Sequence, residues 1–109
     1  MSESELQNQL LTYLNLHKDF FAWRNNSTGI YDPSTKTYRR KVGFDIKGVS
    51  DILGIHKPTG RLVAIEVKSE KGKPTFEQLA FIKRINESGG ISFWVNNFET
   101  FVDMIKTIK

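Results

Sequence analysis

The chain contains no cysteine and only two histidines among its 109 residues. The lack of cysteine excludes a disulfide framework and thiolate zinc sites, and the wide separation of His17 and His56 argues against a histidine-based metal site. We therefore expect oxygen atoms to supply most of the ligands of any bound metal.

Long apolar runs are also missing. No window approaches the roughly 18 uninterrupted apolar residues of a membrane span, and the start Met-Ser-Glu-Ser-Glu lacks the basic and apolar regions of a signal peptide. We expect a soluble intracellular protein that does not contact a membrane. Its length and its 39% hydrophobic content suit one compact domain over residues 1–109.

Positive charge is unevenly distributed, although the net charge of +4 is modest. Five of the sixteen Lys and Arg residues lie between Lys36 and Lys47, against the single acid Asp45. This segment, within a basic arm at about 30–47, is a candidate contact for a polyanion, and residues 37–42 read as an exposed, edge-like strand. The open alternative is a solvated, charged loop.

The apolar pattern predicts the order helix, strand, arm, hairpin, helix, strand, helix. Helices are expected from Ser2 to about His17, from the cap Thr75 to Gly89-Gly90, and over the stripe from Phe98 to Ile108, with strands over 20–24, 51–56, 61–68 and 91–95. The central strands are apolar on both sides, which predicts an α/β fold: a mixed sheet flanked by helices on both faces. Trp23, Trp94 and the phenylalanines lie in apolar runs, so we expect them in the core rather than as base-stacking platforms.

The central hairpin contains two acids and an amine. If His56 pairs with Arg61 across the turn, Asp51 lies directly opposite Glu66, with their Cβ atoms roughly 4.5–5.5 Å apart. Like charges destabilise a sheet at this distance, and Lys68 points to the same face because side chains alternate along a strand.

A divalent cation would remove this conflict. Mg²⁺ and Mn²⁺ favour oxygen ligands, which the carboxylates of Asp51 and Glu66 and the carbonyl of Val67 could supply. Such a metal lowers the pKa of a bound water and stabilises charge on a phosphoryl group, while Lys68 could orient the nucleophile or neutralise the phosphorus centre. The alternative is a purely structural, diagonal ion pair between Asp51 and Lys68.

The chain resembles the VRR-NUC family, a branch of the PD-(D/E)XK nuclease superfamily, over roughly residues 3 to 96. The resemblance rests on the ordered set Gly48-Val49-Ser50-Asp51-Ile52-Leu53-Gly54, then Ile65-Glu66-Val67-Lys68, then Gly72, Gln78 and Gly89. Ser50 stands where the superfamily motif has proline, a position that shapes the backbone rather than binding metal.

This resemblance implies metal ligands at Asp51, Glu66 and the Val67 carbonyl, and a catalytic lysine at Lys68. Gln78 matches a helix glutamine that lies near the metal-bound water or the phosphate.

The resemblance also implies an acid on the first helix, for which Glu5 is the best match and Glu3 the rival. Capping boxes from Ser2 to Glu5 and from Thr75 to Gln78 are the alternative roles, and at Gln78 both roles can coexist.

Contacts to nucleic acid are expected in three places. They comprise Arg24, Asn25 and Asn26 at the end of the first strand, Arg39, Arg40, Lys41 and Lys47 in the arm, and Lys71 and Lys73 in the loop after the hairpin. The first group resembles a polar patch that family members keep beside the active site, and the alternative for Arg24 is a surface arginine at a turn. A planar guanidinium such as that of Arg24 binds phosphate bidentately.

The resemblance implies a Mg²⁺- or Mn²⁺-dependent DNA endonuclease of the cytoplasm of a bacterial or phage-infected cell, acting on branched DNA such as a four-way (Holliday) junction. Cutting a symmetric junction on two strands favours a homodimer. The alternatives are a non-catalytic nucleic-acid-binding module that keeps the fold, and a structural domain with a buried ion-pair network.

Overall fold

The computed structural model describes residues 1–25, 30–34, 37–39 and 46–109 of the chain. Its elements are α1 (Glu3–Leu16), β1 (Phe20–Arg24), β2 (Ile30–Asp32), β3 (Thr37–Arg39), β4 (Ile52–His56), β5 (Arg61–Val67), α2 (Phe76–Glu87), β6 (Ile91–Val95) and α3 (Phe98–Lys106). Strands β1, β4, β5 and β6 form one sheet in that order, and β2 pairs with β3 in a separate ribbon. The helices and strands of the domain lie within about two residues of the bounds predicted from the sequence.

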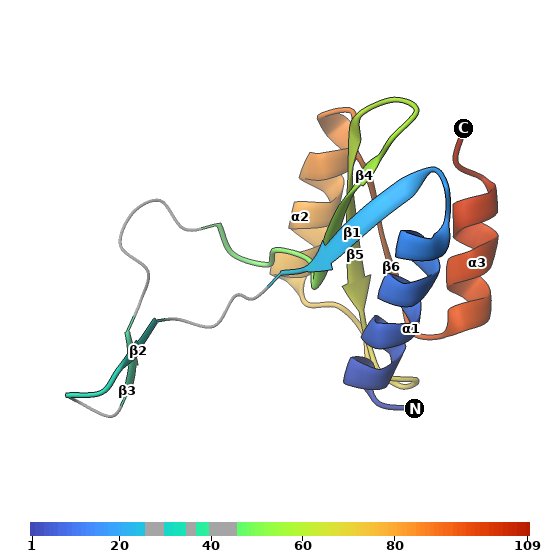
Figure 1. Cartoon of the computed structure of the whole chain (residues 1–109). Helices are drawn as coiled ribbons and strands as arrows, with labels where there is room; N and C mark the ends of the chain where they lie inside the picture. The colour runs from blue at the N-terminus through green and yellow to red at the C-terminus, as the bar shows by residue number, and fades with distance from the viewer. Residues whose placement is uncertain (26–29, 35–36, 40–45) are drawn as a thin grey trace.

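The four-stranded sheet is mixed. Strand β4 is antiparallel to both β1 and β5, whereas β6 runs parallel to β5 after the crossover through α2. In Figure 1, α2 lies on one side of the sheet, and α1 and α3 lie together on the other. This arrangement confirms the predicted α/β fold with helices on both faces.

The main core lies between the sheet and the α1–α3 pair. Leu6, Leu10 and Leu14 recur every four residues along α1 and are all buried, because that spacing keeps them on one helix face. They pack with apolar residues of α3 and of the sheet: Phe101, Ile105, Phe20, Ile52, Val63, Ile65, Val67, Ile91, Phe93 and Val95. Since side chains alternate along a strand, the residues between these point to the α2 face.

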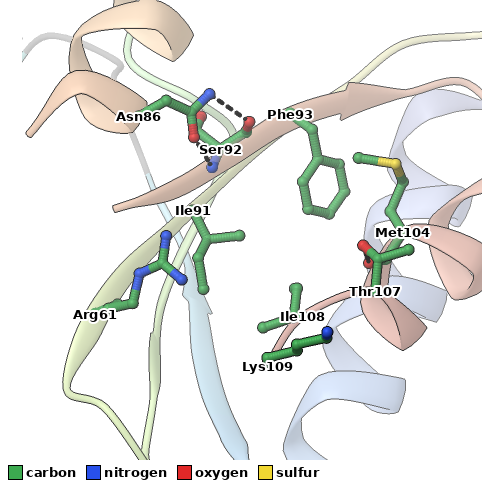
Figure 2. A pocket seen from close by; sticks show the side chains of 9 residues that line it. All are labelled: Arg61, Asn86, Ile91, Ser92, Phe93, Met104, Thr107, Ile108 and Lys109. Atoms are coloured by element: carbon green, nitrogen blue, oxygen red, sulfur yellow. Dashed lines mark hydrogen bonds between the residues drawn. The ribbon is translucent and has the colours of Figure 1, made fainter. Parts of the chain in front are cut away.

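On each outer strand of the sheet, an asparagine from a helix occupies the outward backbone groups of one residue. On β1, Asn15 Oδ1 accepts from the Ala22 N–H at 2.8 Å and Asn15 Nδ2 donates to the Ala22 carbonyl at 3.0 Å. On β6, Asn86 makes the same pair of bonds to Ser92, at 2.9 Å each, as Figure 2 shows. Each asparagine satisfies the outward-facing backbone groups that would otherwise be a template for pairing with another strand.

The exposure of β1 differs from the prediction. Phe20 is buried, but Phe21 and Trp23 are 46% and 44% exposed, so the prediction that both belong to the core is wrong. The physical reason is topological: β1 is an edge strand, and α2 packs on β5 and β6 rather than on β1. Phe76, at the start of α2, is also exposed.

The predicted strand over residues 37–42 is confirmed only for β3, since residues 40–45 lie outside the described part. Within the described residues, no helix has the length and apolar character needed to cross a membrane.

Candidate active site

The hairpin register brings the two acids together. His56 pairs with Arg61 and Ile52 with Ile65, so the next position along places Asp51 opposite Glu66, as predicted. Asp51 Oδ2 accepts a hydrogen bond from the Val67 N–H at 3.0 Å, which holds its carboxylate beside the end of β5. The two acids therefore share one end of the sheet, on the face that α2 covers.

Gly48 fixes the approach of the chain to Asp51. It has a φ of 77°, and a Cβ atom there would lie 2.4 Å from the Glu77 carbonyl oxygen. Only glycine allows both that conformation and this close contact with the first turn of α2. The segment that delivers Asp51 is thus packed directly against the helix that carries Gln78.

The Glu66 side chain is 2% exposed, and its two carboxylate oxygens have different surroundings. Its Oε1 accepts from Gln78 Nε2 at 3.0 Å and lies 3.7 Å from Lys68 Nζ. Its Oε2 is buried without any hydrogen-bond partner. A buried carboxylate oxygen without a partner is costly, so this half of the group has room for a cation or a proton.

Burial raises the pKa of Glu66 to about 8, and the adjacent Asp51 charge adds to the shift. The Lys68 ammonium acts in the opposite direction, and the charge of Glu3 contributes a smaller increase. Burial and a like charge both disfavour the ionised form, whereas a cation held between the two carboxylates would favour it.

Gln78 closes the predicted capping box and also donates a hydrogen bond to Glu66. Its side-chain oxygen accepts from the Thr75 N–H at 2.8 Å and Thr75 Oγ1 accepts from the Gln78 N–H at 3.2 Å, which completes a capping box. Because a backbone N–H can only donate, the amide oxygen must face it, and Nε2 is left to donate to Glu66. The start of α2 thereby orients Glu66.

The donors at this site suit a hard divalent cation. Asp51 and Glu66 supply carboxylate oxygens, and Glu66 Oε2 is free to coordinate. In an extended strand the N–H and C=O of one residue point to the same side, so the Val67 carbonyl is directed toward β4 like its N–H. Within the described residues, no three His, Cys, Asp or Glu side chains cluster closely enough to hold a metal, so the candidate site consists of two carboxylates and a carbonyl.

A second buried oxygen lacks a partner. In the described part of the chain only Ser50 Oγ and Glu66 Oε2 are buried side-chain polar atoms without a hydrogen bond. Ser50 directly precedes Asp51, so both unpaired atoms belong to the segments that build this one site. Apart from its place in the motif, no pattern around Ser50 indicates a buried, unpaired hydroxyl.

Of the two acids on α1, Glu5 closes the capping box with Ser2, and Glu3 makes a small electrostatic contribution at Glu66. Glu5 is fully exposed and its side chain accepts from the Ser2 N–H at 3.3 Å in a capping box, which accounts for the lowered pKa of Glu5. Glu3, by contrast, acts electrostatically on Glu66. The sequence indicates Glu3 only as the acid two residues before Glu5 on the same helix.

The structure describes some of the candidate phosphate-contacting residues and leaves others out. Asn25 lies beside the acids, since its N–H donates to the Asp51 carbonyl at 2.8 Å, whereas Arg24 Nη2 is hydrogen-bonded to Asn8 of α1. Lys47, Lys71 and Lys73 are exposed, and Lys47 lines a groove with Phe76 and Arg84 of α2. The side chain of Arg39 and all of Asn26, Arg40 and Lys41 lie outside the described residues.

Comparisons of the chain with models of protein families, with curated proteins and with solved structures find no match.

Proposed function

We propose that the protein is a metal-dependent nuclease that hydrolyses phosphodiester bonds in DNA, with Asp51, Glu66 and Lys68 at its centre. The observation that carries the proposal is the buried Glu66 carboxylate, which has one oxygen unpaired and the Asp51 carboxylate beside it. Two adjacent carboxylates, one of them fully buried, are destabilising unless a proton or a cation lies between them. A bound catalytic cation would compensate the negative charge of both carboxylates.

Asp51, Glu66 and the Val67 carbonyl would hold the Mg²⁺ or Mn²⁺ ion. When bound, the ion lowers the pKa of water and offsets negative charge on the phosphoryl oxygens. The Asp51 carboxylate is kept in place by the Val67 N–H, and Glu66 by Gln78, so neither needs to reorganise on binding.

Lys68 supplies positive charge next to the reacting phosphate. Its ammonium is 3.7 Å from Glu66 Oε1 and 15% exposed, so substrate can reach it. In the reaction, water attacks phosphorus, the bond from phosphorus to the 3′ oxygen breaks, and that oxygen takes up a proton. The products are a 5′-phosphate and a 3′-hydroxyl, and Lys68 stabilises the charge that builds up in between.

The test incubates labelled linear, flap and four-way-junction DNA with Mg²⁺, Mn²⁺ or Ca²⁺. We expect cleavage by the native chain, and at least about a hundredfold loss in Lys68→Ala and Asp51→Asn, as for removal of other electrostatic catalytic groups. Lys83→Ala and Asp103→Asn are matched controls, because both residues are exposed and lie on α2 and α3 away from the acids. Cleavage that survives in both site variants would refute the mechanism.

The same experiment distinguishes a nuclease from a non-catalytic binding module, since the module would bind DNA in a salt-sensitive manner and leave it intact. We assign part of that salt-sensitive affinity to the arm. Replacing Arg39, Arg40 and Lys41 with Ala should lower the affinity for every DNA sequence and reduce the salt slope. An unchanged salt dependence of DNA affinity would show that these side chains are solvated by water and do not contact phosphates.

We further propose branched DNA as the preferred substrate and a homodimer as the active form, because two cuts on a symmetric junction need two sites related by a two-fold axis. Light scattering at micromolar concentrations, with and without junction DNA, should show twice the monomer mass. Monomer mass under both conditions would contradict the dimer.

A further inference from the structure

Two aromatic rings are exposed side by side on the outer strand of the sheet. Phe21 and Trp23 are 46% and 44% exposed, and their ring centroids are 6.1 Å apart with a 31° angle between the planes. The core does not need them, because Phe20 and Ala22, on the opposite face of β1, make its contacts there. An exposed pair of large aromatic side chains on a small domain usually marks a binding site.

The rings share a face with the candidate catalytic acids. Trp23 pairs with Leu53 on β4, and Asp51 is two residues from Leu53, so all three side chains point to the α2 face. Diagonal neighbours of this kind are roughly 7–8 Å apart, which places the indole one step from the acids and Phe21 one step further. The two rings and the acids thus lie on the same face of the sheet, with Trp23 diagonal to Asp51.

The surroundings of the rings favour a polyanion with flat apolar groups. Exposed Lys18 and Lys57 lie at the Phe21 end of β1, where the Lys57 N–H donates to the Asp19 carbonyl at 2.8 Å. Neither lysine forms an ion pair within the described chain. Exposed cations beside the aromatic rings match a strand whose phosphates flank its bases.

The backbone of β1 argues against an additional β-strand as the occupant. Asn15 already satisfies the outward N–H and C=O of Ala22, so another strand cannot pair there without displacing it. An occupant must instead use the faces of the rings, as an unpaired base does by stacking.

We propose that Phe21 and Trp23 form a stacking platform for unpaired bases of the DNA strand that is cut at the acids. The inference rests on the proposed nuclease function for the identity of the strand, and it specifies a substrate with single-stranded character next to the scissile bond. A platform of this kind selects flaps, gaps or junction arms over continuous duplex.

The test measures binding of a labelled oligothymidylate and of a duplex of equal length in EDTA, which prevents metal-dependent cleavage. We expect Trp23→Ala and Phe21→Ala each to weaken oligothymidylate binding by about fivefold or more, with Trp23→Phe partly restoring it, and with little change for duplex. Leu16→Ala is the matched control, because Leu16 is 83% exposed on α1 and outside the platform. In the Trp94→Phe background, Trp23 fluorescence should be quenched by the oligothymidylate.

Oligothymidylate affinity and Trp23 fluorescence that do not change would overturn the platform. So would variants that lose self-association in light scattering while they bind the oligonucleotide normally, since the rings would then be a subunit contact. Binding is measured without catalysis, so a native chain that stacks bases but cuts no DNA would contradict the nuclease and support the platform.

Discussion

Gln78 Nε2 donates to Glu66 Oε1 at 3.0 Å, and this bond ties the first turn of α2 to the acid at the end of β5. The same amide closes the capping box with Thr75. One side chain therefore both caps the helix and orients the Glu66 carboxylate. The two roles can be separated only by a substitution that changes the donor atom and keeps the acceptor.

Gln78→Glu makes that change. A glutamate at this position keeps the capping box but replaces the donor to Glu66 with a second acid. We expect the pKa of Glu66, measured by carboxyl-carbon NMR, to rise further above its native value, and cleavage to be lost. Thr75→Ala is the complementary control: it should lower the free energy of unfolding by about 1 kcal/mol and leave the pKa of Glu66 in place. Native cleavage and an unchanged pKa in Gln78→Glu would contradict this role.

The raised pKa of Glu66 predicts how stability depends on pH without metal. Between pH values of about 4.5 and 8 the folded protein keeps a proton on Glu66 that the unfolded chain has released. The folded state then binds more protons, so the free energy of unfolding should fall as pH rises through this window and level off above it. Urea denaturation in EDTA from pH 5 to pH 9 measures the slope.

Glu66→Gln is the control for the pH series, because a neutral amide cannot titrate and the fall should be absent. Mg²⁺ should restore stability to the native protein more strongly at pH 8 than at pH 5, since a cation binds the ionised form. Identical slopes for the native and Glu66→Gln proteins would show that Glu66 is not the titrating group.

The sequence was sufficient for features set by local chemistry. The turn before Arg61, the alternation along β4 and β5, and the caps Ser2 and Thr75 each depend on a few adjacent residues, so register and helix starts could be predicted. The opposition of Asp51 and Glu66 follows from that register alone.

Features that depend on distant packing could not be read in the same way. Phe21 and Trp23 occur in an apolar run typical of a core, and only the order of strands shows that one face of β1 has no helix above it. Likewise, the motif favours Glu5 over Glu3 as the acid on the first helix, and only the structure shows the small electrostatic contribution of Glu3 at Glu66.

Asn86 offers a test of how the sheet protects its edge. Asn86→Ala should leave the N–H and C=O of Ser92 without their partners and lower the free energy of unfolding by about 1–3 kcal/mol, measured in urea. It should also increase concentration-dependent association, because β6 becomes available for pairing. Asn86→Asp keeps the acceptor and loses the donor, so its free energy of unfolding should lie between those of the native protein and Asn86→Ala. No change in stability or association in Asn86→Ala would contradict this protective role.

Gly48 and Gly60 form a matched pair that isolates the effect of packing on the site. Their φ angles are 77° and 74°, so alanine pays a similar conformational cost at both, about 1–2 kcal/mol. An added Cβ meets nothing within 4 Å at Gly60 but lies 2.4 Å from the Glu77 carbonyl oxygen at Gly48. We expect Gly48→Ala to lower the free energy of unfolding more than Gly60→Ala, and to reduce cleavage as well, because Asp51 must move away from α2. Urea denaturation and cleavage rates at equal folded fraction measure the two effects. Equal losses of stability with native cleavage in both variants would show that the contact of Gly48 with α2 does not position Asp51.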